Sequence, residues 1–231
     1  MDVVAITFAG ATAATHNRIR VGNEFDVVLY NLREFVKIAK DIRTKTKIIA
    51  IYMMLRDTIE ELPKFIELMA EIGVDEINLS NLTYIPNPSL WELKAYSEMF
   101  IEPQKRLTEI LKKSKDIAKE RGIVIRHRLF TPMEYPECPE APTKTLYIGV
   151  DGDIYPCVYL SLAGFPRCFE RKCHKIPLVS FGNLKTERLG DIIRMKAYIE
   201  FVQRFEMRKR AEFILPDPPE PCKKCYRLYW I

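Results

Sequence analysis

The sequence predicts a mixed α/β protein in which a parallel sheet is followed by a smaller α+β domain. Three observations support this fold class. Strand-length apolar runs alternate with amphipathic helices in the first 131 residues, four prolines gather between residues 132 and 142, and a β-hairpin bordered by two cysteines follows that segment. We therefore predict one domain over residues 1–131 and a second over residues 132–231.

The first domain should contain strands that alternate with helices long enough for crossover connections. The expected strands are 2–8, 47–54, 74–79 and 123–129, and the expected helices are 24–42, 59–72 and 103–121. The continuous apolar run at 2–8 predicts a parallel strand covered on both faces. Residues 10–22 are expected to form a loop. Asp57 or Thr58 with Glu61 predicts a capping box for the helix that Gly73 ends.

The second domain is organised around a predicted hairpin. Its strands are Thr145–Ile148 and Ile154–Tyr155, and the Asp151-Gly152 pair between them favours a tight turn. The hairpin brings Cys138 and Cys157 toward one another. A helix is expected at 189–208, and the sequence then supplies two more thiols in a Cys-x-x-Cys turn, Cys222 and Cys225.

Four thiols in this arrangement suit a tetrahedral zinc ion or an iron-sulfur cluster, and unliganded thiols are the third interpretation. Six cysteines with one Cys-x-x-Cys favour a reduced compartment with metal-bound thiolates, and a disulfide framework is the alternative. Cys168, Cys173 and His174 could add a ligand or a second small metal site. For these we favour the simpler interpretation, in which the thiols are buried as small hydrophobic groups.

Composition narrows the class of partner and the location. Hydrophobic residues make up 48% of the chain, and a net charge of +5 is small against 36 basic and 31 acidic residues. No basic run is interleaved with aromatic residues, so nucleic acid is not indicated. The apolar run near the start lacks a preceding Lys or Arg and is too short for a membrane span. We expect a cytoplasmic protein that does not bind membranes.

Several of these motifs together resemble a known family. Cys138, thirteen residues, Gly152, four residues and Cys157, followed by Gly182-Asn183-Leu184 and the final Cys-x-x-Cys, resemble the SPASM/twitch extension of radical S-adenosylmethionine (radical SAM) enzymes. Residues 7–12 with 16–20 look like the fourth-strand segment of the family's partial (β/α)6 barrel. Residues 57–63 and 72–78 look like the segments around its fifth and sixth strands.

The resemblance implies a fold and a set of cofactor contacts. The chain would be the C-terminal portion of a partial (β/α)6 radical SAM barrel followed by a small SPASM/twitch domain. Cys138, Cys157, Cys222 and Cys225 would fully ligate an auxiliary [4Fe-4S] cluster that serves as an electron relay or a structural staple. Thr7 would lie near the ribose of S-adenosylmethionine and Arg20 near its carboxylate, whereas Ala9 stands where the family has an Asp.

Two family motifs are absent from the sequence, namely the Cys-x3-Cys-x2-Cys of the catalytic cluster and the Gly-Gly-Glu of the second strand. The chain looks like a part that begins at the fourth strand: a split subunit, the product of a wrongly assigned start, or a remnant. It is expected to be inactive alone and to use S-adenosylmethionine only with the missing part. A partner chain would then supply barrel strands 1–3.

The expected function is the auxiliary-cluster and substrate-binding part of an enzyme that matures a peptide, a protein or a cofactor precursor. The alternatives are a non-catalytic metal-binding interaction subunit and a zinc-stapled remnant.

Overall fold

The chain folds into two compact units. The computed structural model describes residues 2–95, 105–127, 133–162, 166–169 and 172–229. Unit 1 comprises Met1–Leu82 and Trp91–Thr131, and unit 2 comprises Thr83–Leu90 and Pro132–Ile231. Within the described ranges, no helix combines the length and apolarity needed to cross a membrane.

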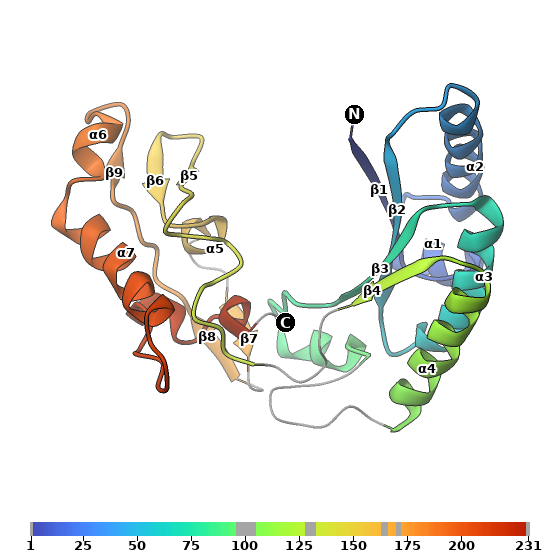
Figure 1. Ribbon diagram of the computed structural model, residues 1–231. Helices are drawn as coiled ribbons and strands as arrows, with labels where there is room; N and C mark the ends of the chain where they lie inside the picture. The colour runs from blue at the N-terminus through green and yellow to red at the C-terminus, as the bar shows by residue number, and fades with distance from the viewer. Residues whose placement is uncertain (1, 96–104, 128–132, 163–165, 170–171, 230–231) are drawn as a thin grey trace. The chain divides into compact units, whose positions relative to one another are not determined.

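Unit 1 is a four-stranded parallel sheet with helices packed on it (Figure 1), which confirms the predicted mixed α/β class with a parallel sheet. Its strands follow the order β1-β2-β3-β4, and every neighbouring pair is parallel. The elements are β1 (Val3–Phe8), α1 (Ala13–Ile19), α2 (Phe25–Asp41), β2 (Lys47–Met54), a 3-10 turn η1 (Ile59–Glu61), α3 (Leu62–Ile72), β3 (Glu76–Asn81), η2 (Pro88–Leu93), α4 (Lys105–Glu120) and β4 (Val124–His127). Predicted positions 103–104 and 128–129 lie outside the described residues.

The helices cover one face of this sheet. Helices α2, α3 and α4 lie on the same side of it in Figure 1. Strand β2 accordingly alternates, with Ile48, Ala50, Tyr52 and Met54 buried on the helix side and the residues between them half-buried. The prediction that the first strand is covered on both faces was wrong within the described residues, because Val3 is 52% exposed. A continuous apolar run in the sequence does not show which face of the sheet the helices cover.

The connection after β1 also differs from its prediction. Residues 13–19 form α1 instead of a loop, and the side chain of Thr12 caps the helix by accepting from the backbone N–H of Thr15 at 3.3 Å. Glu61 is the N-cap residue of α3, but its side chain makes no capping hydrogen bond, so the predicted capping box is not formed. Its carboxylate accepts the backbone N–H of Ala11 at 2.6 Å and the Thr15 hydroxyl at 2.8 Å. Glu61 therefore ties the end of β1 to the start of α3.

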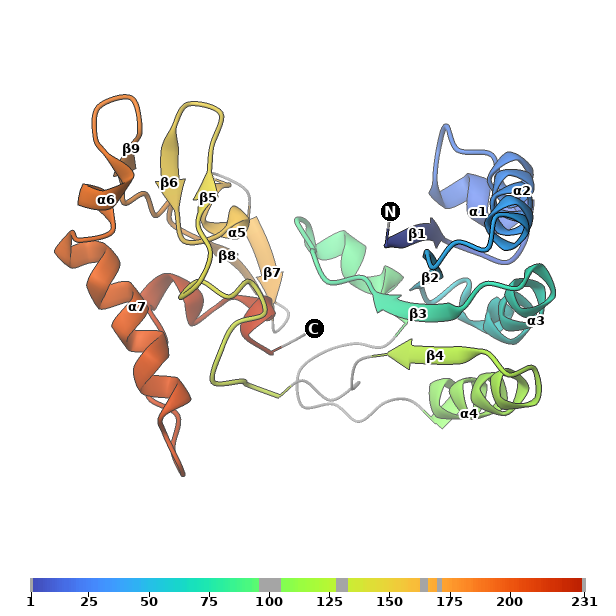
Figure 2. The same ribbon diagram turned by 45° about the horizontal axis from the view of Figure 1, so that its top comes forward.

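Unit 2 contains a small antiparallel sheet, a separate hairpin and a long helix (Figure 2). The elements are β5 (Tyr147–Ile148), β6 (Asp153–Tyr155), α5 (Val158–Ser161), β7 (Pro166–Phe169), β8 (Lys172–Lys175), β9 (Gly182–Asn183), α6 (Leu189–Ile192), α7 (Lys196–Lys209), η3 (Glu220–Cys222) and η4 (Tyr226–Tyr229). The predicted hairpin is present as β5 and β6, with Gly152 in the left-handed region at φ 87°. The single helix expected at 189–208 is instead two, because Met195 has extended backbone.

One polar cluster stands out on the sheet of unit 1. The carboxylate of Glu76 accepts from Lys47 Nζ and from Arg126 Nε, both at 2.7 Å, and thereby joins three neighbouring strands. Only 6% of the Glu76 side chain is exposed. These two hydrogen bonds hold the pKa of Glu76 below its ordinary value of 4.5.

Replacing this carboxylate should destabilise unit 1. Because Glu76→Gln removes the charge that both cations share, we expect the free energy of unfolding in urea to fall by about 1–2 kcal/mol near pH 7. Glu109→Gln, which removes an exposed carboxylate 3.9 Å from Lys105, is the matched control. It should change the free energy of unfolding by less than about 0.5 kcal/mol.

The effect should also depend on pH. A carboxyl whose pKa is lower in the folded chain stabilises the fold fully above its unfolded pKa and loses that effect as the pH falls through the folded pKa. The difference in free energy of unfolding between wild type and Glu76→Gln should therefore become smaller as the pH falls from about 6 to about 3. A constant difference over that range would show that the carboxylate charge is not responsible.

Candidate metal centre

Four cysteines meet in unit 2. Cys138, Cys157, Cys222 and Cys225 form no disulfide, and all four line the same pocket. The sequence predicted these four cysteines as ligands, and the fold brings them together from three separate chain segments. The rest of the lining is mainly apolar and includes Leu160, Phe201, Phe205 and Leu228.

Short turns hold each thiol in place. Cys157 lies two residues after the end of β6, has extended backbone and forms the N-cap of α5. The carbonyl of Cys138 accepts from the backbone N–H of Ala141 at 2.9 Å, and the carbonyl of Cys222 accepts from that of Cys225 at 3.0 Å. The second of these bonds closes the Cys-x-x-Cys turn, so both of its sulfurs can reach one centre.

Burial changes the chemistry of these thiols. It raises the pKa of Cys138 to about 12 and that of Cys157 to about 11, and the neighbouring Cys225 thiol adds to both shifts. An apolar pocket disfavours a bare thiolate unless a cation compensates its charge. The donor set therefore fits a group that carries positive charge and binds sulfur, such as zinc or the iron of a cluster.

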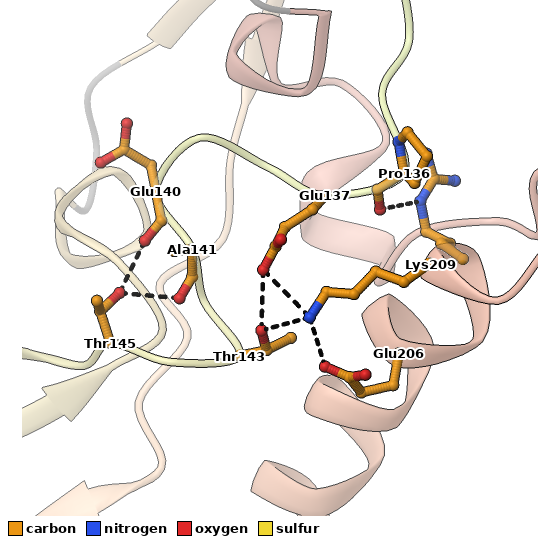
Figure 3. Close-up of polar contacts among 9 residues, drawn as sticks. Pro136, Glu137, Glu140, Ala141, Thr143, Thr145, Glu206 and Lys209 are labelled. Atoms are coloured by element: carbon orange, nitrogen blue, oxygen red, sulfur yellow. Dashed lines mark hydrogen bonds and ion pairs between the residues drawn. The ribbon is translucent and has the colours of Figure 1, made fainter.

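The segment that carries Cys138 is fixed to α7 by polar contacts (Figure 3). Lys209 Nζ lies 3.3 Å from the carboxylate of Glu137, 3.2 Å from the Thr143 hydroxyl and 2.6 Å from the carboxylate of Glu206. The hydroxyl of Thr145 closes the far end of the segment by donating to the carbonyl of Glu140 at 2.7 Å. Helix α7 thus positions a candidate ligand although it contains no cysteine.

Arg208 fixes two cysteine-bearing segments at once. Its guanidinium is buried and donates to the carbonyl of Tyr135 at 2.9 Å and to the carboxylate of Glu134 at 2.7 Å. It also donates to the carbonyls of Pro136 and Pro216. The first three partners precede Cys138, whereas Pro216 precedes the Cys-x-x-Cys turn. Sequence reasoning did not find Arg208, because its partners are distant in the chain.

A second arginine lies in the pocket itself. Arg227 donates to the carboxylate of Glu140 at 2.8 Å, and its guanidinium carbon lies 5.6 Å from the ring centroid of Tyr159. All three residues line the pocket with the thiols. Sequence reasoning missed them too, although each follows a candidate ligand by two positions and that spacing was visible.

Cys168 and Cys173 are not free thiols. They face one another in the register of the β7–β8 hairpin and form a disulfide. The interpretation of both as buried thiols was wrong, since they are bonded and only Cys168 is buried. His174 follows on β8 and its Nε2 atom is buried without a hydrogen-bond partner. Nowhere in the described residues do three or more His, Cys, Asp or Glu side chains form a group that could hold a metal ion.

The two residues predicted to contact S-adenosylmethionine lie in unit 1. Thr7 is half-buried in β1, on the sheet face away from the helices because it is in register with Ile51. Arg20 follows α1 and donates its backbone N–H to the carbonyl of His16 at 2.8 Å. No hydrogen bond joins the Thr7 and Arg20 side chains in the described structure. Ala9, where the family has an Asp, is fully buried.

Comparison with protein families identifies the domain that contains the four thiols. Residues 138–226 match the family model SPASM, described as an iron-sulfur cluster-binding domain. This part of the chain is similar to SPASM domains. The predicted SPASM resemblance is thereby confirmed, and the SPASM domain implies an iron-sulfur cluster. No curated protein matches the chain.

Solved structures show a similar fold. Streptococcus suis SuiB bound to S-adenosylmethionine has a TM-score of 0.53 and 12% sequence identity, over 87% of this chain and 44% of SuiB. Native anSMEcpe with bound AdoMet has a TM-score of 0.48 and 13% identity, over 97% of this chain and 57% of the other. The chain thus spans less than half of the SuiB chain and just over half of the anSMEcpe chain.

The disulfide predicts a simple labelling result. Denatured, unreduced protein should take up four iodoacetamide groups, because four of the six cysteines form no disulfide, and reduction should raise the number to six. Peptide mass mapping should place the two additional groups on Cys168 and Cys173. Full labelling of all six cysteines without reductant would contradict the disulfide.

Proposed function

We propose that the chain is the auxiliary-cluster and substrate-binding part of a radical SAM enzyme that matures a peptide, a protein or a cofactor precursor. The observation that carries this proposal is the set of four thiols outside any disulfide that line one pocket in the part of the chain matched by the SPASM model. The similarity of fold to an S-adenosylmethionine-bound structure supports the family context.

Each part of the pocket has a role in this proposal. Cys138, Cys157, Cys222 and Cys225 hold one [4Fe-4S] cluster and leave no iron open to substrate. When bound, the cluster supplies one-electron transfer or a structural staple. The apolar residues Phe201, Phe205 and Leu228 exclude water from the sulfurs, and Arg208 and Lys209 hold the ligand segments in position.

The family model favours a cluster over zinc. Residues 138–226, which include all four thiols, match a model described as an iron-sulfur cluster-binding domain. Zinc, which would bind four thiolate sulfurs at about 2.3 Å from a single centre, is the alternative.

Anaerobic reconstitution tests the cluster directly. We expect about four iron and four sulfide per wild-type chain, with the loss of most of both in Cys138→Ala and Cys225→Ala. The matched control is the double variant Cys168→Ala and Cys173→Ala, which removes two sulfurs outside the pocket and should keep the full complement. One tightly held zinc, or equal losses in the control, would overturn the assignment of these four ligands.

We also propose that the outer edge of β1 receives the first three barrel strands, from a partner chain or from a longer polypeptide. Within the described residues β1 pairs only with β2, and an unpaired strand edge is a template for further pairing. S-adenosylmethionine would bind only in that complete barrel, where Thr7 and Arg20 are its predicted contacts.

Hydrogen exchange tests the edge. In this chain the β1 amides that face away from β2 should exchange much faster than those of β3, which is paired on both sides. They should become protected once the missing strands are added. Equal protection of β1 and β3 in this chain alone would contradict an open edge.

A further inference from the structure

We propose that Arg227 and Glu140 form a charge pair that positions the ligand segments and sets the reduction potential of the cluster. This inference rests on the proposed cluster in the four-thiol pocket and goes beyond it, because it assigns a role to two residues that are not ligands. Both residues line the pocket, and they are its only charged lining residues in the described chain.

The pair connects all the segments that carry ligands. Glu140 is two residues after Cys138, and Arg227 is two residues after Cys225. The Glu140 carboxylate oxygen Oε1 accepts from Arg227 Nε at 2.8 Å and lies 2.7 Å from Arg227 Nη2, so two guanidinium nitrogens share one acceptor. Eighty-seven residues separate the partners, and the pair therefore links two distant segments.

Tyr159 brings the third segment into the same contact. It is two residues after Cys157, and its ring lies under the Arg227 guanidinium at 5.6 Å from ring centroid to carbon. The ring of Tyr226 packs edge-on against Tyr159 at 5.9 Å between centroids. The Arg227 guanidinium thus contacts Glu140 near Cys138 and Tyr159 near Cys157, and Arg227 itself lies two residues after Cys225. These contacts fix the separation of the three segments that carry the ligands.

Burial makes the charges effective. The Arg227 side chain is 15% exposed and that of Glu140 is 23% exposed, whereas the remaining polar lining is the four thiols and Tyr159. Charges in such surroundings interact more strongly than charges in water. Arg227 stays charged at any ordinary pH, so it is a permanent cation beside four thiolates.

The expected influence on redox behaviour has opposite signs for the two partners. A cluster with four thiolates becomes more negative when it accepts one electron from a low-potential reductant. A neighbouring cation stabilises the reduced form and a neighbouring anion destabilises it, because net charge around a cluster helps to set its potential. In the wild type the two charges largely compensate one another.

The test is an electron paramagnetic resonance redox titration of reconstituted protein, with dithionite as the reductant. Arg227→Gln leaves Glu140 uncompensated and should lower the reduction potential. Glu140→Gln leaves the guanidinium uncompensated and should raise it. The double variant should have a potential close to that of wild type, and so should Arg227→Lys, because it keeps the positive charge. Arg194→Gln, which removes an exposed arginine outside the pocket, is the charge-matched control and should leave the potential unchanged.

The outcomes separate this inference from the function on which it rests. A wild type that assembles no cluster would overturn both. Full cluster content with the same direction of shift in both single variants, or with no shift, would overturn the inference alone. If Arg227→Gln loses the cluster, Glu140→Gln decides the matter, and an unchanged potential in that variant would overturn the pair's electrostatic role.

Discussion

The buried guanidinium of Arg208 is the interaction on which the arrangement of unit 2 depends. Removing a cation from water costs several kcal/mol unless hydrogen bonds replace the lost hydration. Here the replacement comes from Glu134 and from three backbone carbonyls on two segments. Because the fold can bury Arg208 only when these groups surround it, the same requirement fixes the stretches that lead to Cys138 and to Cys222.

In unit 2 a rigid helix supports the loops that carry the four thiols. Helix α7 supplies Phe201 and Phe205 to the pocket, and Arg208 and Lys209 to the loops, while it contains no cysteine. The thiols themselves lie in turns and caps at element ends, where the backbone can approach a bound group closely. A site built in this way takes its precision from the helix and its chemistry from the loops.

Local patterns predicted much of the fold, and long-range pairing accounts for what they missed. Strand β2 has the predicted bounds, because eight apolar residues between polar ends specify a buried strand almost alone. Helix α1 was missed because it is short and polar. It depends on tertiary contacts, such as His16 packed against Phe8 and Phe25. The four thiols had a recognisable spacing, whereas the Arg227–Glu140 pair and the Cys168–Cys173 bond depend on registers that only the folded chain creates.

The short excursion of residues 83–90 has a consequence for dissecting the protein. The chain leaves unit 1 at residue 83, joins unit 2 and returns at residue 91, so the SPASM-containing unit is not continuous in sequence. Within it, the carbonyl of Ile85 accepts the backbone N–H of Cys168 at 2.8 Å, and the Ile85 side chain is almost fully buried. A fragment cut at residue 132 would therefore lose part of its own interior and an acceptor for the β7 backbone. The natural unit of excision is two pieces of chain, not one.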